Sequence, residues 1–183
     1  MIRNMQNTQN PGSSLSNLQP LTPEQLKSWF PPALKNLERI SLEQSNGAIP
    51  QVTAFQAKYI TPDQPEFISP DGRSDVINTK NKSLLVEVMD GAGPYGSQMM
   101  ASMSMMTSMN FEKNDEHEEQ KVVVVNGIKS QQKFEKKKVK TTLNFIHNER
   151  FMIAITANHL TPEQTWKFVE LLKLEELERL GKE

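Results

Sequence analysis

A glycine-rich stretch near the middle of the chain is the first place where residue types and spacing suggest chemistry. In "VEVMDGAGPYGSQMMASMSMM", residues 86 to 106, Gly91, Gly93 and Gly96 match the pattern G-x-G-x-x-G between a strand-like and a helix-like run. Such glycines let backbone N–H groups approach a pyrophosphate at a helix N-terminus, inside a β-α-β unit. A dinucleotide site is therefore the first hypothesis to weigh.

The sequence after the glycines argues against that hypothesis. Asp115 stands about 20 residues downstream, where a ribose-binding acid is expected, but it precedes the strand-like run "KVVVV" instead of ending it. That run continues into Asn126 and Gly127, a strong hairpin signal, so the parallel sheet that forms a dinucleotide crevice is missing. We interpret the glycines as a tight exit from a strand, with Asp90 capping the helix that begins at Pro94. Binding of an anion other than a dinucleotide at the helix N-terminus remains an alternative.

Six of the ten methionines follow the glycines, at positions 99, 100, 103, 105, 106 and 109. On a helical wheel Met99, Met103 and Met106 form one stripe, and Met109 widens it. Three interpretations stay open: a stripe that fills the core, an adaptable apolar surface for a protein or small apolar ligand, or thioether ligands for Cu(I). The four stripe residues are the candidate ligand or partner surface, and the metal alternative uses the first three.

Composition and motifs give no support for catalysis or nucleic-acid binding. The net charge is −1, so no general positive field favours nucleic acid, and the chain has no cysteine. His117, His147 and His159 have no convincing spacing to a nucleophile or a second ligand. The acidic run 115–119 and the basic run 136–140 are interpreted as solvated surface, facing each other across a sheet. We predict no enzyme activity, no cofactor and no metal site of the usual histidine or carboxylate kind.

The elements that must position these residues are a few helices and a meander of strands. "LTPEQL" at residues 21–26 and "LTPEQT" at residues 160–165 each combine an N-cap threonine, a proline and a capping-box glutamine. Runs with period-two alternation predict strands. They are "VTAFQAKYI", "SLLVEVMD", "KVVVV", "QQKFEKKKVK", "TTLNFIHN" and "RFMIAITAN". Short turns between the later runs require antiparallel neighbours.

We therefore predict an α+β fold with a single antiparallel sheet of about five to seven strands. An N-terminal helix, a central methionine-rich helix and a C-terminal helix pack on it. Residues 1–20, rich in Asn, Gln and Ser, are predicted to be a disordered tether, and 21–183 a single domain with a long loop at 61–82. No run has the roughly 20 apolar residues of a transmembrane helix, and the first residues lack the apolar stretch of a signal peptide.

The order of these elements resembles a group of uncharacterised bacterial exported or lipid-anchored proteins. The resembling parts are "WFPPALKNLERI", "VEVMDGAG", a helix, and then "VNGIKSQQKFEKKKVKTTLNFIHNERFMIAITANHL" before a leucine-rich helix. Arg150 and Phe151 match an Arg-Phe pair of that family, whereas Asn36 and Leu37 stand where it often has Gly-Trp. The resemblance implies a fold similar to PsbP-like extrinsic proteins and a place in the periplasm or cell envelope. Without it, the cytoplasm is the default expectation.

Together these observations predict a non-catalytic, envelope-associated binding or structural module. The methionine-rich helix and its adjacent loops would contact a protein or a small apolar ligand. The alternative is a Cu(I)-handling protein that uses Met99, Met103 and Met106.

Overall fold

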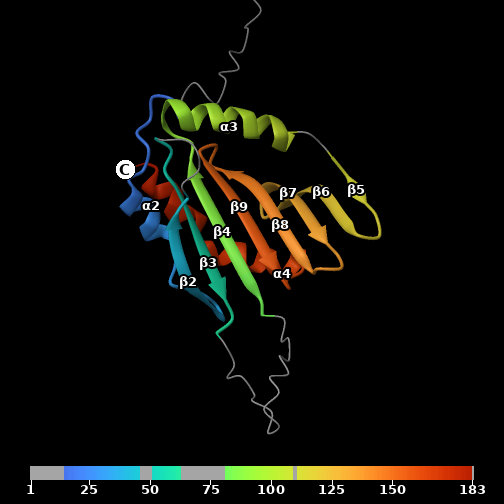
Figure 1. Ribbon diagram of the computed structural model, residues 1–183. Coiled ribbons are helices and arrows are strands. Elements are labelled where there is room, and N and C mark those ends of the chain that lie inside the picture. Colours follow the sequence, from blue (N-terminus) through green and yellow to red (C-terminus); the bar gives the residue numbers. More distant parts are fainter. Residues whose placement is uncertain (1–14, 46–50, 63–80, 109–110, 183) are drawn as a thin grey trace, which may run out of the picture.

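The computed structural model describes residues 15–45, 51–62, 81–108 and 111–182, with only the backbone described for residues 106–108. Its described strands form one antiparallel sheet in the order β1-β2-β3-β4-β9-β8-β7-β6-β5 (Figure 1). The strands are β1 (Ala33–Leu34), β2 (Leu37–Gln44), β3 (Ala54–Ile60), β4 (Ser83–Asp90), β5 (Lys113–Asn114), β6 (Glu118–Val125), β7 (Ile128–Glu135), β8 (Lys140–His147) and β9 (Phe151–Asn158).

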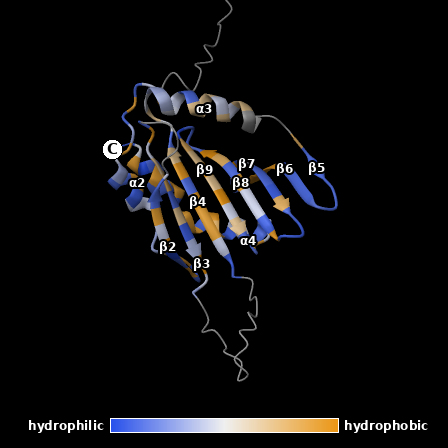
Figure 2. Cartoon of the chain, in the orientation of Figure 1, coloured by the Kyte–Doolittle hydropathy of each residue, from blue (hydrophilic) through white to orange (hydrophobic). Residues whose placement is uncertain are grey.

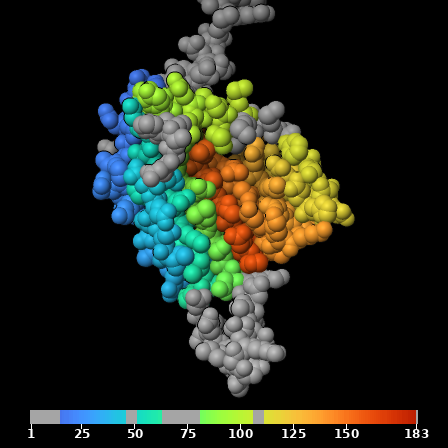
Figure 3. Space-filling model, viewed as in Figure 1, coloured from blue at the N-terminus to red at the C-terminus, as the bar shows by residue number. Residues whose placement is uncertain are grey.

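The helices of the described residues are divided between the two faces of this sheet. They are α2 (Pro23–Trp29), α3 (Gly93–Ser108), α4 (Pro162–Val169) and α5 (Leu174–Leu180), with a short 3-10 helix, Glu170–Leu172, between the last two. Apolar residues of α2, α4 and α5 join those of one sheet face in the main core. Helix α3 crosses one end of the opposite face, and the rest of that face lies at the molecular surface (Figures 1 and 3).

The main core follows from strict alternation along the central strands. Strand β9 buries every second residue, Phe151, Ile153, Ile155 and Ala157, and β4 and β8 do the same in register beside it. Apolar side chains on one side of a pleated strand must face a second layer to leave water, and the C-terminal helices provide it. The hydropathy colouring shows β4 and β9 as the most hydrophobic strands (Figure 2).

Both copies of the L-T-P-E-Q motif begin a helix, as predicted. Thr22 Oγ1 accepts the Gln25 N–H at 3.2 Å, and the Gln25 side chain accepts the Thr22 N–H at 2.9 Å. Thr161 and Gln164 repeat the same capping box at the start of α4. The expected single C-terminal helix is interrupted, because Lys173 adopts a left-handed conformation with φ 51° and separates the 3-10 helix from α5.

The predicted sheet of five to seven strands was wrong, since the sheet has nine. Strands β1 and β5 have two residues each, too few for any period to be recognised. Strand β2, "LERISLEQ", contains a register shift between Arg39 and Ser41, which breaks its alternation. The fold is therefore more extensively β-structured than the α+β arrangement expected from sequence.

The predicted turns have mixed outcomes. Asn126 and Gly127, with φ values of 50° and 81°, connect β6 to β7 as expected. Asn148 and Glu149 also form the predicted turn, between β8 and β9. The lysine run, by contrast, is no strand: residues 136–139 form the turn between β7 and β8. Most of the long loop predicted at 61–82, and most of the predicted tether, lie outside the described residues.

Candidate functional site

The glycine turn directly follows a buried carboxylate, Asp90, at the end of β4. Its Oδ1 accepts hydrogen bonds from Arg150 Nε at 2.8 Å and from the Ala92 N–H at 3.0 Å. Its Oδ2 accepts from Arg150 Nη2 at 2.8 Å and from the Leu21 N–H at 2.7 Å. Asp90 thus does not act as a simple cap for α3, because two of its four partners belong to Arg150 and one belongs to the segment before α2.

Arg150, in the turn between β8 and β9, is as fully engaged as its partner. Besides Asp90, its guanidinium donates to the Gly181 carbonyl at 2.5 Å and to the Gln19 carbonyl at 3.0 Å. Its carbon Cζ lies 5.2 Å from the centre of the Phe151 ring. Both oxygens of the carboxylate and three of the guanidinium nitrogens already have protein partners, so the pair serves to connect segments and leaves little hydrogen-bonding capacity for a substrate.

The glycines themselves are required by close packing around this pair. A Cβ added at Gly91 would lie 2.1 Å from Met100 Cγ and 2.7 Å from the Arg150 carbonyl oxygen. A Cβ at Gly96 would lie 2.7 Å from the Gly91 carbonyl carbon. Among the three glycines of the motif, Gly93 alone has a positive φ, 81°, a conformation that favours glycine. These contacts support the tight strand exit predicted from sequence.

Helix α3 buries a different methionine from those of the predicted stripe. Met100 is 4% exposed and packs with Leu15 and Met89 in a second, smaller core cluster. Met99 packs against the edge of this cluster, and Met99 and Met103 are half-buried. The side chain of Met106 and all of Met109 lie outside the described residues, so the three-sulfur Cu(I) arrangement stays a prediction.

The outward side of α3 is formed by residues at helical spacing that carry no charge. We call these residues, all exposed, the α3 outer stripe. They are Tyr95, Gln98, Ala101, Ser102 and Met105. Met105 is 73% exposed. The whole helix from Gly93 to Ser108 contains no Asp, Glu, Lys or Arg, and Figure 2 shows it mostly in intermediate colours. A surface helix ordinarily carries charged residues on its outer side, so this composition is unusual.

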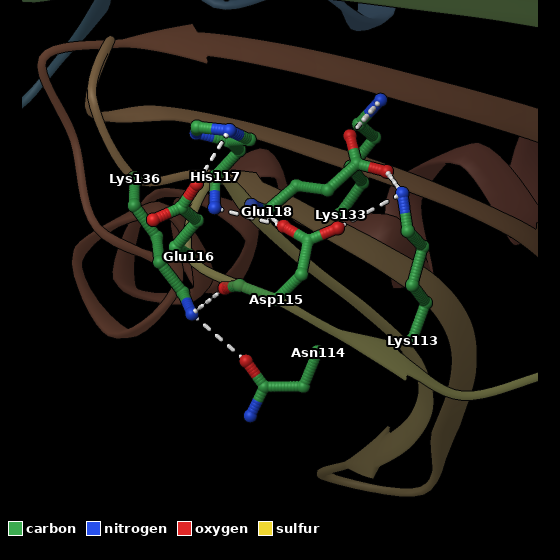
Figure 4. A network of polar contacts seen from close by, with 8 residues as sticks. All are labelled: Lys113, Asn114, Asp115, Glu116, His117, Glu118, Lys133 and Lys136. Carbon is green, nitrogen blue, oxygen red and sulfur yellow. Dashed lines mark hydrogen bonds and ion pairs between the residues drawn. The ribbon is translucent and has the colours of Figure 1, made fainter.

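A third cluster of chemically active side chains surrounds the turn between β5 and β6 (Figure 4). Asp115 Oδ1 accepts the N–H groups of His117 and Glu118, both at 2.8 Å. Lys113 lies 3.1 Å from Asp115 and 2.6 Å from Glu118, whose other oxygen lies 2.8 Å from Lys133. The backbone donors, and then Lys113, hold the pKa of Asp115 well below its usual range.

Of the basic run, Lys136 contacts the β5–β6 turn, whereas Lys138 and Lys140 pair with Glu135 of β7. Lys136 Nζ donates to Asn114 Oδ1 at 2.8 Å and to the Asp115 carbonyl. All of these charges lie at the solvent-exposed edge of the sheet, where such ion pairs stabilise little and mainly fix the turn. Across the ranges that the structure describes, no group of three or more His, Cys, Asp or Glu side chains is placed to hold a metal ion.

The three histidines are distributed over separate parts of the fold. His117 lies 3.0 Å from Glu116 in the β5–β6 turn. His147 ends β8, whereas His159 follows β9, and these are opposite ends of two paired strands. By strand register His117 and His159 lie at the same end of the sheet, but β7 and β8 separate their strands. His147 lies at the other end, so the three rings do not form a common site.

No known protein family, curated protein or solved structure matches the chain. The resemblance to exported bacterial proteins and to the PsbP-like fold thus stays a hypothesis. Within the described residues, no helix is long and apolar enough to cross a membrane.

Loss of the buried Asp90 charge should strongly destabilise the fold. We expect Asp90→Asn to lower the free energy of unfolding by about 3–5 kcal/mol, because the charge of Arg150 would stay buried without its counter-ion. Adding Arg150→Met to that variant should recover part of the loss. Urea denaturation measures both effects. The matched control is Glu163→Gln, which breaks the exposed 2.9 Å pair with Lys167 and should change little. Equal effects of the two single substitutions would contradict the role of the buried pair.

The β5–β6 turn should keep its structure to unusually low pH. The pKa of Asp115 is lower in the folded protein than in the unfolded chain. Its contribution to stability is therefore complete above about pH 4, the pKa in the unfolded chain, and is lost as pH falls through the folded-state pKa. In an NMR titration we expect the side-chain carboxyl carbon of Asp115 to keep its ionised chemical shift down to about pH 4 and to change only below it. Asp115→Asn keeps the acceptor but should abolish this transition. A titration midpoint of Asp115 near pH 4 would show that the hydrogen bonds of the turn do not stabilise its ionised carboxylate.

Peroxide oxidation should distinguish the buried from the exposed methionines of α3. We expect Met105 to form sulfoxide first and Met100 to form it last, because oxidation requires access to the thioether sulfur. Mass spectrometry of proteolytic peptides gives the rates, and the protein unfolded in urea provides the reference in which all sites react alike. If Met100 reacts as fast as Met105 in the folded protein, the placement of α3 is wrong.

Proposed function

We propose that the protein is a non-catalytic binding module whose α3 outer stripe receives an apolar segment of another protein. The observation that carries this proposal is the absence of charge along the whole of a helix whose outer side is exposed. Burying a charge in an interface costs free energy unless the charge is paired, so interface centres are depleted of charged residues. A helix without charge that faces water is suited to being covered.

Further support comes from where exposed apolar side chains gather. Of the large hydrophobic residues exposed in the described part of the chain, Tyr95 and Met105 lie on α3, and Phe111 follows the helix. Leu18 lies in the segment before α2, close in sequence to Gln19, which is bonded to Arg150 beside the glycine turn. The inner side of α3 is anchored by Met100, so its outer stripe is held in place before any partner arrives, which lowers the entropic cost of binding.

The small residues of the stripe favour a helical partner. Ala101 and Ser102 would let another backbone approach closely, while Met105 and Tyr95 flank them with larger, adaptable surface. Methionine can adjust its shape to different partners because it is unbranched and flexible. We further propose, from the family resemblance alone, that this binding takes place in the cell envelope.

Photo-crosslinking in the organism that makes the protein tests the proposal. A benzophenone amino acid at Met105 or Tyr95 should give a discrete adduct with one other protein, whereas the same group at Lys167, an exposed position of α4, should give none. Ala101→Glu should lower the yield from Met105 about tenfold or more, because it introduces an unpaired charge into the contact. The variant should fold normally, since Ala101 is exposed. Equal crosslinking from α3 and α4, or adducts that persist in the Ala101→Glu variant, would overturn the proposal.

A further inference from the structure

The two edges of the sheet differ in how well they are protected against pairing with another strand. Strand β2 is irregular, with the register shift between Arg39 and Ser41 and the polar residues Glu43 and Gln44 at its end. Strand β6 is paired on its outer side only at its beginning, where β5 contacts Glu119 and Gln120. Beyond that point, no described residue pairs with the outer side of the run 121–125, "KVVVV". Exposed, regular and apolar edges of this kind are templates for strand addition.

The backbone direction along β6 identifies the groups that are available. The Glu118 carbonyl accepts the Asp115 N–H at 2.9 Å, on the β5 side, and the His117 carbonyl accepts the Lys136 N–H at 2.8 Å, on the β7 side. Since alternate residues of an antiparallel strand point to opposite neighbours, even-numbered residues of β6 face outward. The N–H and C=O groups of Val122 and Val124 are therefore directed away from the sheet, and the Val124 side chain is 69% exposed.

We infer that this edge, Val122 to Val125 of β6, is an interface at which two copies of the chain join their sheets in antiparallel fashion. The two-fold axis passes through Val123. Val122 of each copy then faces Val124 of the other, so this pair occurs twice. The outward groups of these residues then form four main-chain hydrogen bonds between the copies. Valine faces valine across the axis, a favourable cross-strand pair in a sheet.

The charges near the edge fit this register. Lys121 falls opposite Val125 of the second copy, so no like charges face each other, and within its own chain Lys121 is paired with Glu119 at 2.5 Å. Because the run is self-complementary, a second copy can pair with all of its outward main-chain groups. A second copy is therefore the occupant that we propose. A closed two-fold pair also covers both edges at once and leaves no β6 edge for further addition.

Sedimentation velocity over a range of concentrations tests the inference. We expect a reversible monomer–dimer equilibrium, and Val124→Lys should raise the dissociation constant about tenfold or more, because the symmetric interface loses two valine contacts together. Val124→Pro is a second variant. It removes an N–H that makes no bond inside the monomer, so the fold should be kept, but the strand can no longer pair. The matched control is Ile40→Lys, which places the same charge at an exposed position, 54% accessible, on the opposite edge.

Hydrogen exchange of individual amides shows whether the dimer uses this edge. The Val122 and Val124 amides should become protected as concentration rises, while those of Leu42 and Gln44 on β2 should not. A protein that stays monomeric up to millimolar concentration would overturn the inference. So would a dimer that is unchanged by both Val124 variants, or a dimer whose concentration-dependent protection lies on α3. The first two results would leave the crosslinking test of the α3 outer stripe unaffected, whereas protection on α3 would bear on that test as well.

Discussion

The buried pair of Asp90 and Arg150 is the interaction on which the arrangement of the whole molecule depends. It joins the end of β4 to the turn before β9 and, through Leu21, Gln19 and Gly181, also holds the segment before α2 and the end of α5. An ion pair removed from water is stable only when its remaining hydrogen-bonding groups are satisfied, and here they are. Because backbone carbonyls and N–H groups supply most of the additional partners, the pair constrains the course of the chain more than the identity of neighbouring side chains.

This constraint connects the two sides of the sheet through consecutive residues. Alternation along β4 directs Asp90 toward the layer of α2 and α5 and directs Met89 toward α3, where it packs with Met100. Gly91 follows immediately, and the space that its missing side chain leaves is occupied by Met100 and by the Arg150 carbonyl. The position of α3 is therefore set by close backbone packing at its N-terminal end and by one buried methionine. The residues of its outer stripe are exposed, so this anchoring does not bury them.

How much of this could be predicted from the sequence depends on the range over which each signal acts. The capping boxes at Thr22 and Thr161 and the Asn126-Gly127 turn are local, and all three were predicted correctly. The central strands were recognised because one face of each is buried continuously. The two-residue strands and the bulged β2 were missed because they carry no sustained period. The lysine run was wrongly assigned to a strand, although consecutive lysines give no alternation of apolar and polar residues. The Asp90–Arg150 pair was missed because sixty positions separate its members. A signal did exist: each residue occupies a place, in or beside an apolar strand, where an unpaired charge would be costly.

Charged residues are unevenly distributed along the β6 edge. Lys113, Asp115, Glu118 and Lys133 are concentrated around the start of β6, where β5 already covers the edge and additional protection is unnecessary. In the uncovered run 121–125 the charged residue, Lys121, stands next to the part that β5 covers, and Val122 to Val125 carry no charge. A chain selected only to stay monomeric would place its lysines where the backbone is unpaired, because desolvating them would oppose strand addition. Four valines at that position are instead what a pairing edge requires: high β-propensity, no charge at the centre and a regular pleat that a second strand can match.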